Sequence, residues 1–315
     1  MPRNDEDSMV WSVGMTSKSY LQFEKILGLV LIYPQFGLHH YLFWLLYNYY
    51  SRHRFANYLQ QIKLNLMPTP LDILLDPISL SLLGMYTLLM LWEAMFPGRK
   101  LPAVKYWKLR GIAVFVFYFY LSSYLPLLWA QYLPGTQLVD LSGWGSIGGA
   151  LFGILLYEFG MYVWHRTMHR NKYLWKMFHQ MHHSAERLDT YGAFYFSPLD
   201  MIGWTVLSTV CFSVLTGLTP QAITITLLVT NFLGIFQHAN IKTPVWLGYF
   251  IQRPESHTVH HAKGIHAYNY SDLPLFDILF GTFRNPVRYE HETGFYNGAS
   301  SRIKDMLLFR EVDKP

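Results

Sequence analysis

Nine histidines lie in four short motifs whose spacing suits metal binding. In His165-Arg-Thr-Met-His169, an interval of four residues places both imidazoles on one face of a helix, one turn apart. The motifs HQMHH at 179–183 and HTVHH at 257–261 repeat intervals of three and four, and QHAN at 237–240 adds one further histidine. Imidazole nitrogen is a ligand for iron, zinc, copper and nickel. The predicted ligands are His165, His169, His179, His182, His183, His238, His257, His260 and His261.

The number of histidines predicts more than one metal ion. A structural zinc site closes with four ligands, and nine histidines exceed that number twofold. Two ions are therefore the expected count. A two-metal site can clamp a substrate for hydrolysis or bind and reduce dioxygen, and the ligand types alone leave both open. The single cysteine, Cys211, allows neither an internal disulfide nor a cluster of thiolate ligands.

Three acidic residues lie near these motifs. On a helix, Glu158 falls about 20° from both His165 and His169. We expect it either to orient a ligand histidine without touching the metal or to form a hydrogen bond between helices. Asp200 and Asp277 are expected to cap helices or brace ligands rather than to react.

The composition indicates that membrane helices position the histidines. The chain has 315 residues, of which 51% are hydrophobic and only 14% charged, and its mean hydropathy is +0.14. Soluble domains carry about 25% charged residues, so a soluble surface is excluded. Residues 1–18 are polar and lack the pattern of a cleaved signal peptide.

Five apolar segments predict the helices that cross or enter the bilayer. They are residues 78–92, 112–130, 147–164, 201–218 and 222–236, the last two joined by a tight hairpin. Residues 23–50 are also apolar and predict one span or two short interfacial helices. The aromatic run Tyr191, Phe194, Tyr195 and Phe196 either lines a hydrocarbon channel or belongs to an interfacial belt.

Charge placement predicts which side of the membrane carries the histidines. Five Lys or Arg residues lie between positions 99 and 110, before the second segment, whereas the loop at 131–145 carries only Asp140. The positive-inside rule makes the first loop cytoplasmic, and the third segment returns to that side at His165. All four motifs are thus expected at the cytoplasmic face, where a lipid could keep its head group at the interface while its chain or ring reaches the metals. The net charge of +5 is explained by these loops and gives no reason to expect nucleic-acid binding.

The motifs HRTMH, HQMHH, QHAN and HTVHH, followed by NYSDLPLFDILFGTF at 269–283, resemble the fatty acid hydroxylase and sterol desaturase superfamily, in its bacterial-type sterol desaturase branch. The resemblance covers about residues 75–285. It implies an all-α, multi-pass membrane protein with a non-haem di-iron site. Such a site would use dioxygen and external electrons to hydroxylate or desaturate a lipid. It also implies that the nine histidines are the ligands, with zinc as a substitute metal.

The chain departs from the family pattern in two respects. Some members carry a second histidine near the position of His238, where this chain has Asn240 and, more remotely, His266. Asn240 either holds a metal-bound water or caps a helix end. Several members carry a fused cytochrome domain, but only about 18 N-terminal and about 30 C-terminal residues lie outside the expected membrane region. Electrons are therefore expected from a separate protein.

The domain organisation expected from the sequence has three parts. Residues 1–70 form a tail with membrane-associated segments, 71–285 the catalytic membrane domain and 286–315 a polar tail. The membrane is the bacterial inner membrane or the endoplasmic reticulum. A sterol, fatty acyl chain, ether lipid, ornithine lipid or carotenoid all remain open as substrates, as do hydroxylation and desaturation. The alternatives are a zinc-dependent membrane hydrolase, a non-oxidative metal-binding membrane protein, and a degenerate member that binds lipid.

Overall fold

The structure is a computed structural model that describes residues 67–314. The predictions for residues 1–18 and 23–50 lie outside this range. The chain divides into two compact units at Pro77. In the described part of the first unit, helix α5 (Pro70–Leu75) begins with a capping box in which Thr69 and Asp72 each satisfy the backbone N–H of the other.

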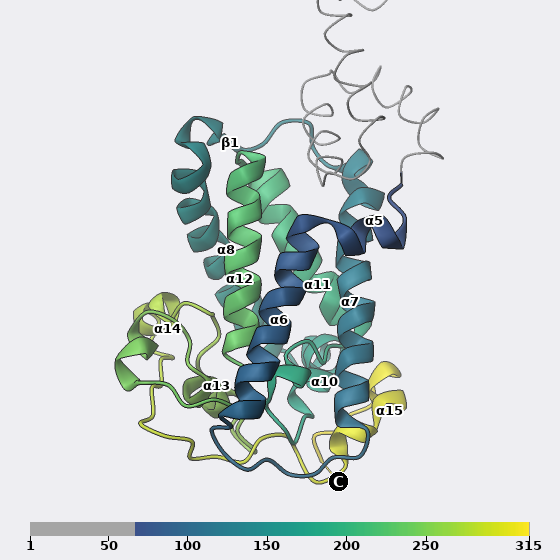
Figure 1. The fold of residues 1–315 in the computed structure, drawn as a ribbon, viewed down its shortest axis with the longest axis vertical. Helices are drawn as coiled ribbons and strands as arrows, with labels where there is room; N and C mark the ends of the chain where they lie inside the picture. Colours follow the sequence, from purple (N-terminus) through teal and green to yellow (C-terminus); the bar gives the residue numbers. More distant parts are fainter. Residues whose placement is uncertain (1–66, 315) are drawn as a thin grey trace, which may run out of the picture. The chain divides into compact units, whose positions relative to one another are not determined.

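The described part of the second unit is a bundle of long helices with shorter elements at its ends (Figure 1). The long helices are α6 (Pro77–Met95), α7 (Trp107–Trp129), α8 (Gly145–Arg170), α11 (Pro198–Thr209), which continues into the π-helix η6 (Val210–Leu215), and α12 (Pro220–Phe236). The shorter elements are η2 (Ala130–Tyr132), β1 (Val139–Asp140), η3 (Ser142–Trp144), α9 (Lys172–Leu174), η4 (Trp175–His179), α10 (Gln180–His183), η5 (Thr190–Gly192), β2 (Thr216–Gly217), η7 (Val245–Tyr249), α13 (Pro254–His260), α14 (Leu275–Leu279), η8 (Ala299–Ser301) and α15 (Ile303–Leu307).

This architecture confirms the predicted all-α, multi-pass fold. All five apolar segments are helical, and their bounds differ from the predicted ones by a few residues. Within residues 67–314, four helices are long and apolar enough to span a membrane: Pro77–Met95, Trp107–Tyr132, Ser142–Arg170 and Pro198–Leu215. Helix α12 is also apolar but shorter. The protein is therefore an integral membrane protein.

Two helices of the bundle begin with the same local signal. Ser197 and Thr219 cap α11 and α12 by accepting hydrogen bonds from backbone N–H groups of the first turn, and a proline follows each cap. Proline fits the first helical position because its missing N–H would have no partner there. These caps set the start of α11 at the end of the bundle that carries α10, and the start of α12 at the opposite end.

A short parallel pairing ties together the loops at that opposite end. Strand β1, which precedes α8, pairs with β2, which precedes α12, so that Val139 lies opposite Thr216 and Asp140 opposite Gly217. Both strands are two residues long. Because α8 and α12 start from this joint, they run side by side and deliver their C-terminal ends to the same place (Figure 1).

Helices α8 and α12 approach closely because small residues face each other. A side chain at Gly149 would lie 2.9 Å from the Cβ atom of Ala222, and one at Gly153 would lie 2.8 Å from Oγ1 of Thr226. The Thr226 hydroxyl also donates to the Ala150 carbonyl at 3.3 Å. Glycines four residues apart are typical of close helix pairs in membranes, where dispersion contacts replace the hydrophobic effect.

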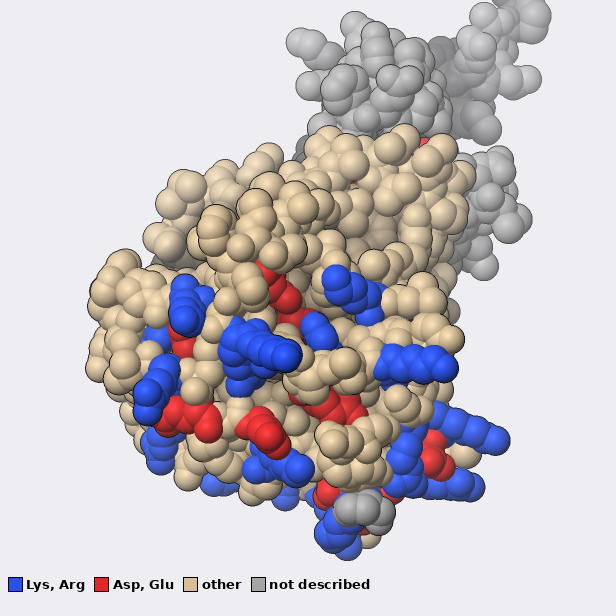
Figure 2. Space-filling model, turned by 60° about the horizontal axis from the view of Figure 1, so that its bottom comes forward, with Lys and Arg blue, Asp and Glu red and all other residues tan. Residues whose placement is uncertain are grey.

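Charged side chains gather at the end of the second unit where α10, α13 and α15 lie, and the helix surface beyond it is almost entirely uncharged (Figure 2). This surface displays apolar side chains such as Leu88, Phe117 and Leu151. Such a division suits a bundle that meets lipid along its length and water at one end.

We expect Gly153→Ile to lower the stability of the purified protein by about 1–3 kcal/mol, because a branched side chain would collide with Thr226 and Leu218 and force α8 and α12 apart. Thermal unfolding in detergent would measure this. Gly148→Ile is the matched control, since the nearest atom to a Cβ there is 3.6 Å away and belongs to Trp144 of the preceding turn. Equal losses for both variants would contradict the packing argument.

Candidate metal centre

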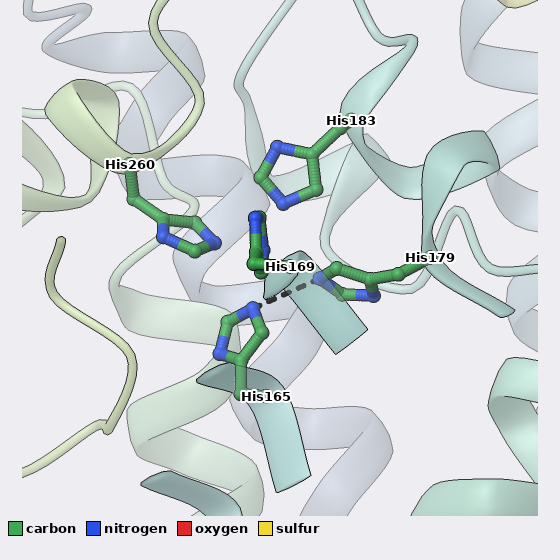
Figure 3. A group of neighbouring side chains, drawn as sticks. All are labelled: His165, His169, His179, His183 and His260. Carbon is green, nitrogen blue, oxygen red and sulfur yellow. Dashed lines mark hydrogen bonds between the residues drawn. The ribbon is translucent and has the colours of Figure 1, made fainter. Parts of the chain in front are cut away.

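The nine predicted ligands converge at one end of the bundle and form two groups. In each group the ligand nitrogens all lie within 4.8 Å of one another. The five-histidine group contains His165, His169, His179, His183 and His260, and the four-histidine group contains His182, His238, His257 and His261. Figure 3 shows the imidazoles of the five-histidine group turned toward a common centre.

Four segments supply these side chains: α8, the continuous turns η4 and α10, the end of α12, and α13 with the residue after it. The second and the fourth segment each supply histidines to both groups. Helix α8 supplies His165 and His169 in its last turns, and His238 follows the end of α12. Each HxxHH motif is split between the groups. The pair separated by four residues goes to one group, and the middle histidine goes to the other: His182 from the first motif and His260 from the second. This division follows from helix geometry, because positions i and i+4 share a face whereas i+3 lies to one side.

Distances within the groups fit metal binding. The Nε2 atoms of His165 and His179 are 2.9 Å apart, and in the four-histidine group His238 Nε2 lies 3.0 Å from those of both His182 and His257. Two nitrogens bound to one metal at about 2.0–2.1 Å would be separated by roughly 3 Å.

Several further nitrogens point at these centres without a partner. In the part of the chain that the structure describes, Nε2 of His169, His183 and His260 has no hydrogen bond although each atom is buried. Buried polar atoms are rarely left unsatisfied. The residues present therefore fit two metal ions, one in each group.

Burial keeps the histidines neutral, which is the form that binds metal. Desolvation lowers the pKa of His238 to about 4. For the other ligand histidines outside the membrane-spanning segments, desolvation first and neighbouring imidazoles second hold the pKa well below its usual value. These are His179, His182, His183, His257, His260 and His261.

The acidic residues act as braces. The Asp200 carboxylate accepts a hydrogen bond from Nδ1–H of His179 at 2.7 Å, so Nε2 is turned toward the group. Asp277 accepts hydrogen bonds from the backbone N–H groups of Tyr270 and Ser271. Asp200 therefore braces a histidine, one of the two roles expected for it, whereas Asp277 braces the backbone beside the site and contacts no histidine through these bonds.

The structure corrects the expectation for Glu158. Its Oε2 accepts hydrogen bonds from the N–H groups of Asp272 and Leu273, at 2.8 and 3.0 Å, and it contacts no ligand histidine. Seven residues of helix separate it from His165, a rise of about 10 Å, so sharing a stripe of the helix does not bring the two side chains together.

The side chain of Asn240 contacts the backbone of Arg99. Its amide donates to the Arg99 carbonyl at 2.8 Å and accepts from the Arg99 N–H at 3.1 Å. The backbone N–H of Asn240 donates to the buried carboxylate of Glu93. Asn240 thus joins the turn after α12 to the segment after α6, and its expected role at a metal-bound water stays a prediction.

Sequence reasoning missed the importance of His266. This residue is a tenth histidine at the site: its Nδ1 lies 3.1 Å from Nδ1 of His183, and its carbonyl accepts a hydrogen bond from His169 at 2.8 Å. The signal in the sequence was its position five residues after His261. Because it belongs to no helical spacing pattern, only the tertiary structure places it.

Comparison with known proteins agrees with this geometry. Residues 150–282 match the fatty acid hydroxylase family model, so this part of the chain is similar to that family. The chain is 31% identical over 149 residues to the ornithine lipid hydroxylase OlsE of Rhizobium tropici, covering 46% of this chain and 44% of that protein. It is 27% identical over 146 residues to sphinganine C4-monooxygenase 2 of Arabidopsis thaliana, covering 42% and 53% of the two chains.

A third relative is the Delta(7)-sterol-C5(6)-desaturase of Nicotiana tabacum, 32% identical over 151 residues, which cover 46% of this chain and 53% of the desaturase. The matches span about half the length of these relatives. No solved structure matches the chain. The resemblance to the fatty acid hydroxylase and sterol desaturase superfamily, first indicated by the histidine motifs, is thus confirmed.

We expect the metal-free protein to lose stability as the pH falls from about 7 to 5. The folded-state pKa values of the buried histidines lie below the ordinary value of about 6.5, so the unfolded chain binds more protons in this window and unfolding is favoured. Each such histidine lowers the free energy of unfolding by about 1.4 kcal/mol for every unit that the pH falls, as long as the pH lies between its folded-state pKa and its unfolded-state pKa. Thermal unfolding after chelator treatment would measure the slope.

The double variant His182→Ala, His260→Ala should flatten this slope, whereas His291→Asn, which lies outside both groups, serves as the control. A metal-free protein whose unfolding temperature is constant over the whole pH window would contradict the assignment of the histidines as buried and neutral.

Proposed function

We propose that this protein is a membrane-bound di-iron enzyme that uses dioxygen and external electrons to hydroxylate or desaturate a lipid. The observation that carries the proposal is the pair of histidine groups, with their ligand nitrogens within 4.8 Å of one another, at the end of a membrane-spanning bundle. Its nine histidines are the proposed ligands, five for one iron and four for the other.

The choice of iron rests on the ligand type and on the relatives. Imidazole binds iron and zinc alike, but zinc has no redox chemistry. The relatives are named as a hydroxylase, a monooxygenase and a desaturase, and all three names describe oxidations. Bound iron would supply the activation of dioxygen and the removal of a hydrogen atom from carbon.

The substrate class is supported by the same relatives and by the position of the site. Their names specify an ornithine lipid, sphinganine and a sterol, which share a polar head and a long apolar body. In this chain, the aromatic side chains Phe196 and Trp204 border the histidines. The ring centroids of Phe196 and His182 are 4.5 Å apart, and those of Trp204 and His165 are 5.7 Å apart. These rings would exclude water and guide an apolar chain.

The charged loops support an orientation in the membrane. Lys and Arg side chains gather at the end of the bundle that carries the histidines (Figure 2), which supports a cytoplasmic location for the site. Electrons would come from a separate donor protein approaching that face.

We expect the full chain, expressed with ample iron and purified in detergent, to contain about two irons. His260→Ala removes a ligand of the five-histidine group and His182→Ala one of the four-histidine group, so each should lower the content toward one iron. The double variant should hold neither. Elemental analysis measures the metal, and His291→Asn is the control.

The same variants test the reaction. Lipids of cells that produce the protein should gain one oxygen atom or lose two hydrogen atoms in mass spectra, and the double variant should abolish this. Zinc that persists after iron supplementation, together with lipid hydrolysis independent of dioxygen, would overturn the oxidative assignment in favour of a hydrolase.

We expect Phe196→Ala to lower turnover by about tenfold to a hundredfold and to spread oxidation over neighbouring carbons, because the chain loses the ring that positions it beside His182. Product analysis by mass spectrometry would measure both effects, with metal content unchanged. Phe194→Ala is the matched control: this ring is buried in the same cluster and lies 6.4 Å from the Phe196 ring, but its other ring contacts are with Tyr86, Phe115 and Tyr118 rather than with histidines. Equal effects of the two variants would exclude a specific role for Phe196.

A further inference from the structure

The loop at residues 266–270 contacts four of the five members of the five-histidine group. Three of its carbonyl oxygens, at alternate residues, accept hydrogen bonds from Nδ1 atoms. The pairs are His169 with the His266 carbonyl at 2.8 Å, His260 with the Tyr268 carbonyl at 2.6 Å and His165 with the Tyr270 carbonyl at 2.7 Å. Each bond fixes a ring so that its Nε2 atom is the one left for a metal.

The two remaining members are also held. Nδ1 of His183 lies 3.1 Å from Nδ1 of His266, and Nδ1 of His179 lies 2.7 Å from the Asp200 carboxylate. Every imidazole of the five-histidine group therefore has an Nδ1 partner supplied by the protein.

The four-histidine group is held differently. Its His238 donates Nδ1–H to the Gly234 carbonyl at 2.6 Å. Among residues 67–314, Nδ1 of His257 and of His261 has no hydrogen-bond partner. His182 has a weak partner in the Tyr195 backbone, which raises the pKa of His182 against the larger effect of burial. The protein thus fixes one ring of this group firmly, gives a second ring a weak backbone partner and, among residues 67–314, leaves two rings without an Nδ1 partner.

The loop has an unfavourable backbone that its surroundings hold in place. His266, Tyr268 and Asn269 have φ angles of 43°, 70° and 49°, in the left-handed region that residues other than glycine rarely adopt. Such residues persist only where neighbouring contacts over-determine them, and they are concentrated at functional sites.

The side chain of Asn269 is the main fastening of this loop. Its Nδ2 donates to the carbonyls of Ser256 and Arg284 at 2.8 and 2.9 Å, and its Oδ1 accepts from the Arg284 N–H at 2.7 Å. Asp277 holds the next two residues through the N–H groups of Tyr270 and Ser271. None of these groups is a proposed metal ligand.

We propose that the loop 266–270, fastened by Asn269, is a positioning device that sets the five-histidine group before metal binds. That group consequently retains its ion longer than the four-histidine group does. The inference rests on the proposed function only in requiring that both groups bind metal. Its physical basis is that rings already turned toward the centre need no ordering when the ion enters.

The test uses the full chain in detergent, loaded anaerobically with iron(II) and then challenged with an excess of a chelator that colours on binding iron. We expect two phases, each releasing about one iron per chain. His238→Ala, in the four-histidine group, should remove the fast phase and so assign it.

Asn269→Gly is the decisive variant, because glycine accepts the positive φ angle and removes only the side-chain hydrogen bonds. It should speed the slow phase by about tenfold to a hundredfold and leave the fast phase unchanged. His266→Asn tests the loop independently: asparagine tolerates the same backbone conformation but lacks the ring nitrogen facing His183. It should also speed the slow phase, by a smaller factor.

Thr226→Val is the control for general loss of stability, since it removes a buried hydrogen bond between α8 and α12 in the membrane region. An Asn269→Gly protein that releases both irons faster to the same extent, as the control does, would reduce the loop to a structural role and overturn the inference. Two irons lost from the wild-type protein in a single phase would overturn it while leaving the proposed function intact. A wild-type chain that holds no iron would remove the proposed function itself.

Discussion

The burial of nine neutral imidazoles, whose ligand nitrogens lie within 4.8 Å of one another in each group, is the constraint on which the rest of the structure depends. Lone pairs that face one another away from water are unfavourable unless a proton or a cation lies between them. Protonation is opposed by desolvation and by the neighbouring rings, which leaves a metal ion as the natural partner. The protein must therefore keep these polar side chains together and away from water. Its helices, helix caps and loops provide the contacts that do this.

The membrane helices meet this constraint by fixing where chain ends come together. Close packing through Gly149 and Gly153 keeps α8 beside α12, and the joint between β1 and β2 makes both start at the same level. Their other ends consequently deliver His165, His169 and His238 to one place. Contacts between α8 and α12 in the apolar region thus determine where the histidines lie at the polar end of the bundle.

Local rules predicted much of this arrangement from the sequence. Helical spacing was enough to place His165 beside His169, and hydropathy located the five long helices. Spacing did not predict that each HxxHH motif is divided between the two groups, because intervals of three and four both lie near one face of a helix. The same rules failed for Glu158, because a shared helical stripe carries no information about axial distance, and they could not identify Arg99, far away in the chain, as the partner of Asn240. They also passed over His266, which lies in a loop with no periodicity.

Helix α8 serves only the five-histidine group and the end of α12 only the four-histidine group, but α10 and the region of α13 serve both. His183 and His261 belong to different groups, yet their rings stack with centroids 4.1 Å apart. A shift of either helix would move ligands of both groups together. The groups also differ on the outer side of the rings, at Nδ1. One group meets backbone carbonyls, His266 and Asp200 there, and the other meets the Gly234 carbonyl and, more weakly, the Tyr195 backbone. Outer hydrogen bonds are therefore one means by which this fold can give two interleaved groups of histidines separate properties.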